Sequence, residues 1–167
     1  TDHVIESFRN DLYSGYKTSE GMEPVLLEQI PILEDALRAL GVTVWAMEKY
    51  EADDALASAV RVACEDHTVH KVFVLTPDKD LGQVVQGKRV VQMDRRNNVI
   101  IDEDAVKETL VAIIGQLDQG DGVDFETVLT NADARGIDRQ LAESKLDELS
   151  NEGTLHEPRF GWFRIVS

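Results

Sequence analysis

The sequence contains a single cysteine, Cys64, so no intrachain disulfide can form. It also lacks an apolar run long enough to cross a membrane, and no signal-peptide-like hydrophobic segment follows Thr1. A reducing cytoplasm is the simplest compartment for such a chain, and no membrane partner is expected.

Basic residues are scarce. Lysine and arginine number 17 against 32 aspartates and glutamates, for a formal net charge of −15. This balance argues against a surface that coats nucleic acid, because phosphate binding requires cationic side chains. It leaves room for a metal-dependent nuclease, in which bound cations and a few placed basic residues handle the phosphate locally.

Prolines number only 4 and apolar residues make up 43% of the chain, so a substantial core can form. Apolar residues recur at helical spacing over residues 25–40, where Gly41 is a plausible stop, and again after Glu51. Strands are expected at 42–47, 71–75, 89–92 and 99–101, with a short helix at 81–85. Helices that alternate with strands predict an α/β fold with a parallel sheet and right-handed crossovers.

The pattern changes after Asp104. Helices are expected at 106–117, 125–134 and 139–149, separated by glycine-containing breaks, and a two-stranded ribbon is expected around 155–166. Three short helices followed by a ribbon are typical of a winged helix. We therefore expect two domains, residues 1–106 and 107–167.

Two short acidic runs are the most informative feature of the sequence. Glu51-Ala52-Asp53-Asp54 opens an apolar-periodic helix, and Thr76-Pro77-Asp78-Lys79-Asp80 follows a buried-type strand. Taken singly, each run is more simply explained as a helix cap or a solvated turn. Taken together, acids at a helix start and at the carboxyl end of a strand can converge on one point, where divalent metal relieves their repulsion.

These runs resemble the paired acidic motifs of bacterial-type 5′-3′ exonucleases in the flap-endonuclease superfamily. The upstream stretch from Phe8 to Lys17, the aspartate at position 2 and the later stretch from Val91 to Arg96 fit the same family in order. The resemblance covers residues 1 to about 108. It implies a PIN-like α/β domain with a parallel sheet flanked by helices, here truncated at its N-terminus.

The resemblance also implies a site and its cofactor. Two Mg²⁺ or Mn²⁺ ions would activate water and stabilise the leaving oxygen, with DNA 5′ ends or flaps as substrate. Arg9 and Lys17 match basic residues that steer and clamp the scissile phosphate. The implied metal-site carboxylates are Asp2, Glu51, Asp53, Asp54, Asp78 and Asp80.

The sequence departs from the family pattern at both ends of this region. The family's first strand carries an essential aspartate, and this chain begins after that point, at Thr1, without an initiator methionine. The Gly-Asp-x-x-Asp-type motif and the helix–three-turn–helix DNA clamp are also missing after the helix at 106–117. We therefore expect impaired catalysis, and the alternative is a non-catalytic accessory module of DNA replication.

Residues from about 110 to 166 resemble the winged-helix domain of archaeal minichromosome-maintenance helicases. Their third helix carries Arg139 and Lys145 among many acidic residues: Asp138, Glu143, Asp147, Glu148 and Glu152. So acidic a face should repel DNA. A contact with a replication or repair protein is the expected role of this part.

Overall fold

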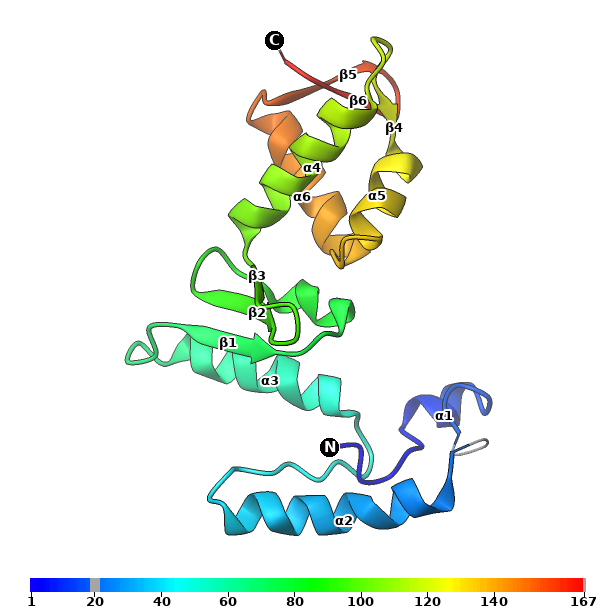
Figure 1. Cartoon of the computed structure of the whole chain (residues 1–167), viewed down its shortest axis with the longest axis vertical. Helices are drawn as coiled ribbons and strands as arrows, with labels where there is room; N and C mark the ends of the chain where they lie inside the picture. The colour runs from blue at the N-terminus through cyan, green and yellow to red at the C-terminus, as the bar shows by residue number, and fades with distance from the viewer. Residues whose placement is uncertain (19–21, 167) are drawn as a thin grey trace. The chain divides into compact units, whose positions relative to one another are not determined.

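The computed structural model of the chain describes residues 1–18 and 22–166 (Figure 1). Contacts between residues separate two compact units, Thr1–Val62 and Ala63–Ser167. The domain boundary expected near residue 106 lies within the second unit, and the two-domain assignment stays a prediction.

The first unit contains the helices α1 (Arg9–Leu12) and α2 (Pro24–Ala39) and the larger part of α3 (Ala52–Glu65). Proline suits the first position of α2, because that amide has no partner within a helix. Gly41 has a φ of +80°, the left-handed conformation in which helices commonly end. The helices expected at 25–40 and after Glu51 are thus confirmed.

The strand expected at 42–47 is wrong. Met47 forms an isolated parallel bridge with Asp2, and hydrogen bonds join Thr1 and Val4 to Trp45 and Met47. The segment is therefore extended, but it pairs with only a few residues. Alternation of apolar residues predicts an extended backbone, but among residues 1–18 and 22–166 the segment pairs only through the isolated bridge of Met47 with Asp2, so no ladder forms.

A three-stranded sheet in the second unit has the order β1 (Val72–Leu75), β2 (Val90–Asp94) and β3 (Val99–Ile101). The expected parallel pairing holds for β1 and β2, which the 3-10 helix η1 (Lys79–Val84) connects. It is wrong for β3, which runs antiparallel to β2. A tight turn returns the chain directly into β3, whereas a parallel pairing requires a crossover. The fold is mixed α/β.

The rest of the second unit consists of three helices and a second small sheet. The helices are α4 (Glu103–Leu117), α5 (Phe125–Asp133) and α6 (Arg139–Asn151). The strands β4 (Val123–Asp124), β5 (Leu155–Arg159) and β6 (Trp162–Ile165) form an antiparallel sheet in the order β4-β6-β5 (Figure 1). The three helices and the ribbon expected from the sequence are present. Their assignment to the winged-helix class stays a prediction.

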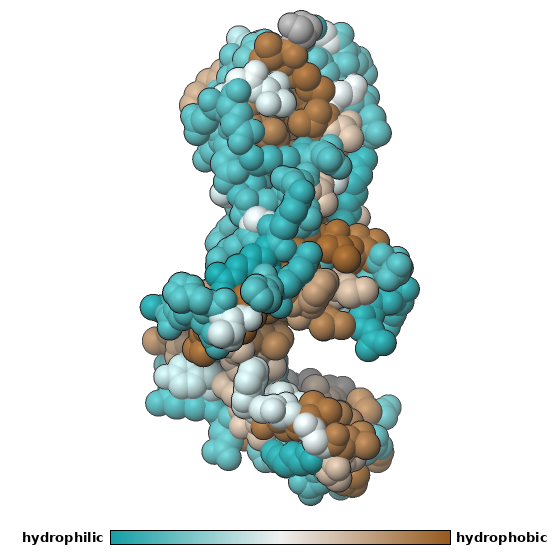
Figure 2. Space-filling view, turned by 90° about the vertical axis from the view of Figure 1, so that its left-hand side faces the viewer, coloured by the Kyte–Doolittle hydropathy of each residue, from teal (hydrophilic) through white to brown (hydrophobic). Residues whose placement is uncertain are grey.

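The main buried apolar cluster lies in the second unit. Its fully buried members come from α4, α5, α6 and β5, and include Leu110, Ile113, Ile114, Val128, Leu146 and Leu155. The first unit instead exposes many apolar side chains, several of them on α2, and apolar surface gathers over this unit in Figure 2. No helix within residues 1–18 and 22–166 is long and apolar enough to span a membrane.

Candidate functional site

Asp2 caps the start of α3. The first amides of a helix have no partner within the helix, and Asp2 Oδ1 accepts the amide of Ala52 at 2.6 Å. A carboxylate is also favoured at this end by the helix dipole. The cap brings Asp2 next to the acidic run at 51–54, although 48 residues separate them in the sequence.

Arg9 joins the two acids that flank the first residues of α3. Its Nη1 donates to Glu51 Oε1 at 3.0 Å and to Asp54 Oδ2 at 2.9 Å, and its Nη2 donates to Asp54 Oδ1 at 2.8 Å. This fork matches the planar guanidinium to both oxygens of Asp54, an arrangement that a lysine cannot reproduce.

Lys17 lies where Asp2 and Glu51 converge. Its Nζ is 2.5 Å from Asp2 Oδ2 and 3.6 Å from Glu51 Oε2. Glu51 thus faces Arg9 with one oxygen and Lys17 with the other. Two carboxylates from distant parts of the sequence share one cation at this point.

Two polar residues hold the loop that carries both basic side chains. Ser7 is buried, and its Oγ donates to Glu51 Oε1 at 2.9 Å. Asn10 accepts the amide of Ser7 and donates to the carbonyl oxygen of Lys17 at 2.7 Å. Sequence reasoning missed Ser7 and Asn10 because a single polar residue in a loop carries no pattern.

The contacts shift the acidity of the site. Partial burial alone raises the pKa of Asp2, but hydrogen bonds from Lys17 and Ala52 outweigh it, so the pKa lies below its ordinary value. The hydrogen bond from Arg9 likewise lowers the pKa of Asp54. Burial lowers the pKa of the Lys17 ammonium, and its contacts with Asp2 and Glu51 more than reverse this effect. Asp2 and Asp54 are therefore ionised at neutral pH.

The other sequence-predicted site residues, Asp53, Asp78 and Asp80, have no part in these contacts of Arg9 and Lys17. Asp53 is an exposed residue in the first turn of α3. Asp78 and Asp80 are exposed residues of the second unit, directly after β1, and Asp78 Oδ1 accepts the amide of Asp80 at the start of η1.

A buried glutamine fixes the backbone that leads to Asp78. Gln92 of β2 donates from Nε2 to the carbonyl oxygens of Thr76 and Asp78, at 3.2 and 2.7 Å. Gln92 lies in an apolar strand, where periodicity marks no polar residue as functional.

The structure thus brings together five of the eight sequence-predicted site residues: Asp2, Arg9, Lys17, Glu51 and Asp54. Within residues 1–18 and 22–166, no group of three or more His, Cys, Asp or Glu side chains is arranged to hold a metal ion. The donor set is nevertheless composed of hard carboxylate oxygens, the ligands that Mg²⁺ prefers. In the structure the Lys17 ammonium occupies the position between Asp2 and Glu51.

Comparison with known proteins decides the family. The family model described as 5′-3′ exonuclease, N-terminal resolvase-like domain, matches residues 1–111. The chain belongs to this family. The match takes in the first unit, the sheet β1-β2-β3 and the beginning of α4. It ends before α5, so the likeness of the remaining residues to an archaeal helicase domain stays a prediction.

The chain spans less than a third of the length of the three curated relatives that follow. A Mycoplasma pneumoniae 5′-3′ exonuclease is 38% identical over 85 residues, which are 50% of the chain and 28% of that protein. DNA polymerase I of Borreliella burgdorferi is 32% identical over 104 residues, covering 62% of the chain and 11% of the polymerase. DNA polymerase I of Mycobacterium leprae is 35% identical over 92 residues, covering 54% and 10%. No solved structure matches the chain significantly.

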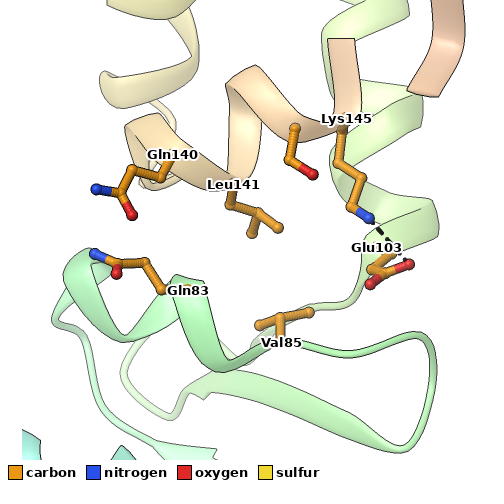
Figure 3. A pocket seen from close by; sticks show the side chains of 7 residues that line it. Gln83, Val85, Glu103, Gln140, Leu141 and Lys145 are labelled. Carbon is orange, nitrogen blue, oxygen red and sulfur yellow. Dashed lines mark ion pairs between the residues drawn. The ribbon is translucent and has the colours of Figure 1, made fainter. Parts of the chain in front are cut away.

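A separate pocket of about 280 Å³ in the second unit belongs to no part of the exonuclease motifs (Figure 3). Gln83 and Gln140 lie near one another at one end, and Lys145 and Glu103 lie at the other. Lys145 is buried, and its Nζ lies 3.2 Å from Glu103 and 2.5 Å from Glu148. The pocket's only ammonium group is therefore already neutralised by two carboxylates.

The Arg9–Asp54 pair predicts how the stability of the first unit depends on pH. A carboxyl whose folded pKa is depressed stabilises the fold above its unfolded pKa, and this stability is lost as pH falls through the folded value. We expect the urea midpoint of the first unit, followed by Trp45 fluorescence in a Trp162→Phe background, to fall below about pH 4. In Arg9→Met the fall should be smaller, because the pKa of Asp54 returns towards its ordinary value. Parallel pH profiles of the two proteins would contradict this account.

Proposed function

We propose that the chain is the metal-dependent nuclease part of a 5′-3′ exonuclease and hydrolyses phosphodiester bonds at DNA 5′ ends or flaps. The observation that carries the proposal is the convergence of Asp2 and Glu51 on one cationic position in a member of this family. Curated relatives named 5′-3′ exonuclease and DNA polymerase I support it.

The cofactor we propose is a pair of Mg²⁺ or Mn²⁺ ions. When bound, such ions supply Lewis-acid activation of water and neutralise charge on the leaving oxygen. The residues that would hold them are Asp2, Glu51, Asp53, Asp54, Asp78 and Asp80. The depressed pKa values of Asp2 and Asp54 keep these ligands deprotonated without metal.

Arg9 and Lys17 are proposed to bind and orient the scissile phosphate. Both are partly exposed and both already lie against anionic oxygens, so a phosphate offers them equivalent partners. The loop fastened by Asn10 keeps the two basic groups at a fixed separation. Their positive charge would stabilise the charge that develops on the phosphate oxygens.

We further propose that this chain is a slow nuclease. Arg9 and Lys17 pair with the carboxylates of Asp2, Glu51 and Asp54, so the ions and the substrate must compete with these internal contacts. Ion pairs this exposed to solvent are worth about 0.2–1 kcal/mol each, and several together weaken metal binding measurably.

Cleavage of a 5′-labelled DNA flap in the presence of Mg²⁺ tests the proposal. We expect slow release of short 5′ products that is abolished by EDTA and by Asp78→Asn. Asp35→Asn, which removes an exposed carboxylate of α2, should leave cleavage unchanged. If the wild-type chain neither cleaves the flap nor gives heat on titration with Mg²⁺ or Mn²⁺, the nuclease proposal is wrong.

A specific observation favours a second candidate, an accessory module that contacts a replication or repair protein through a winged helix formed by residues 107–167. The two basic residues of α6 are both neutralised: Arg139 by Glu126 and Glu143, and Lys145 by Glu103 and Glu148. A helix that presents no unpaired positive charge is poorly suited to phosphate contacts, so this part favours a protein partner over DNA.

A further inference from the structure

Glu34 is unusual among the residues of α2. It is the buried residue of this helix, whereas several apolar residues of α2, among them Leu26, Ile32 and Leu33, are more than half exposed. Burying a carboxylate while leaving leucines in water is unfavourable unless the carboxylate is well bonded. The hydrogen-bond partners of Glu34 must therefore compensate for its burial.

Those partners come from the start of the chain. Glu34 Oε1 accepts a short hydrogen bond from Thr1 Oγ1, and Glu34 Oε2 lies 3.1 Å from His3 Nδ1. Arg38, one turn further along α2, adds a weaker contact at 3.5 Å. The hydrogen bond from Thr1 is the main reason that the pKa of Glu34 lies below its ordinary value. The carboxylate is charged and fully engaged.

The residue between these two partners is Asp2. In an extended backbone, successive side chains point to opposite sides. Thr1 and His3 are bound to Glu34, whereas Asp2 contacts Lys17 and the amide of Ala52. Backbone hydrogen bonds from Thr1 to Trp45 and from Val4 to Met47 also hold residues 1–4 in place. The Glu34 carboxylate thus sets the direction in which the Asp2 side chain points.

We propose that Glu34 is a positioning residue for Asp2. By anchoring residues 1 and 3 to α2, it directs the Asp2 carboxylate towards Lys17 and the start of α3. The link to catalysis rests on the proposed nuclease function, but the positioning itself does not. Within residues 1–18 and 22–166, the hydrogen bonds of Glu34 go to Thr1, His3 and Arg38 and not to Lys17, Glu51 or Arg9, so Glu34 acts on the site through the backbone of residues 1–3.

The amide of Ala52 reports directly on Asp2, because Asp2 Oδ1 is its hydrogen-bond acceptor. In Glu34→Leu, which keeps a side chain of similar size but removes both acceptors, we expect the NMR resonance of this amide to shift towards that of Asp2→Asn. Its hydrogen exchange should become at least about tenfold faster, as expected for loss of a hydrogen bond to a charged group. Glu34→Gln, which can still accept from Thr1, should restore most of the wild-type signal.

Two further variants separate positioning from a general loss of structure. Asp35→Asn removes the adjacent, exposed carboxylate of α2 and another Arg38 partner, and should leave the Ala52 amide unchanged. Thr1→Val leaves α2 intact and removes one anchor, so it should move the resonance in the same direction as Glu34→Leu, by a smaller amount. An Ala52 amide that stays unchanged in both Glu34→Leu and Thr1→Val would overturn the proposal.

A Mn²⁺ titration of the same variants distinguishes this proposal from the proposed function. If Glu34→Leu perturbs Ala52 and weakens Mn²⁺ binding at least about fivefold, both stand, and a loss of this size matches one weakened hydrogen bond. If Ala52 is perturbed but the wild-type chain binds no Mn²⁺, the positioning role stands and the nuclease site does not. If Glu34→Leu leaves the Ala52 amide unperturbed and the wild-type chain binds Mn²⁺, the positioning role of Glu34 is wrong and the proposed metal site stands.

Discussion

Leu146→Ala is expected to lower the free energy of unfolding of the second unit by about 2–5 kcal/mol. Leu146 lies on α6, is fully buried, and belongs to the cluster built by α4, α5 and β5. The substitution removes three side-chain carbons from a packed interior. Their transfer free energy is lost, and the helices only partly fill the cavity that remains.

Urea unfolding followed by the fluorescence of Trp162 measures this loss, in a Trp45→Phe background that silences the first unit. Phe160→Ala provides the contrast, because it truncates a larger apolar side chain that is 99% exposed at the tip between β5 and β6. Its free energy of unfolding should change by less than about 0.5 kcal/mol. Equal losses for the two variants would mean that the helical cluster is not what stabilises this unit.

Glu51→Gln is expected to weaken Mn²⁺ binding by at least about 10- to 100-fold, the range found when even an outer partner of a metal ligand is removed. The substitution keeps the size of the side chain and its acceptor for Arg9 and Ser7, but it removes the charge that faces Lys17. Flap cleavage should fall in parallel if the proposed function holds.

The free Mn²⁺ signal in electron paramagnetic resonance measures the affinity, and Glu28→Gln on the exposed surface of α2 is the matched control. The control should bind as the wild type does. Indistinguishable affinities of Glu51→Gln and Glu28→Gln would remove Glu51 from the metal site, while the Arg9 and Lys17 contacts would remain a structural network.

Regular patterns in the sequence predicted most helices and strands, because apolar period and glycine stops act locally. Residues 25–40 and 139–149 are close to the observed α2 and α6. Pairing was harder to foresee. Whether residues 42–47 form a strand depends on what lies beside them, and the direction of β3 depends on a tight turn, neither of which follows from periodicity.

The acidic motifs predicted the chemical character of the candidate site, but they did not predict the residues that support it. Glu34 and Arg38 have the spacing of an ordinary surface ion pair on a helix, so nothing marked Glu34 as buried against Thr1 and His3. Gln92 occupies a position in β2 that suits an apolar residue, and its role depends on the path of the chain from Thr76 to Asp78. Such contacts join residues far apart in sequence and carry no local signature.

If the start of α3 is a metal site as proposed, its pairing of acids with bases separates folding from metal binding, two events that many metal proteins combine. Asp2, Glu51 and Asp54 carry three negative charges, and Arg9 and Lys17 supply two positive ones, which leaves a single excess negative charge. A cluster of unmatched acids would need its ions in order to fold, as metal-dependent small domains do. Under the proposed function, these paired charges would let the first unit fold in metal-free solution, and ion capture would be a later exchange in which the lysine and arginine side chains move aside.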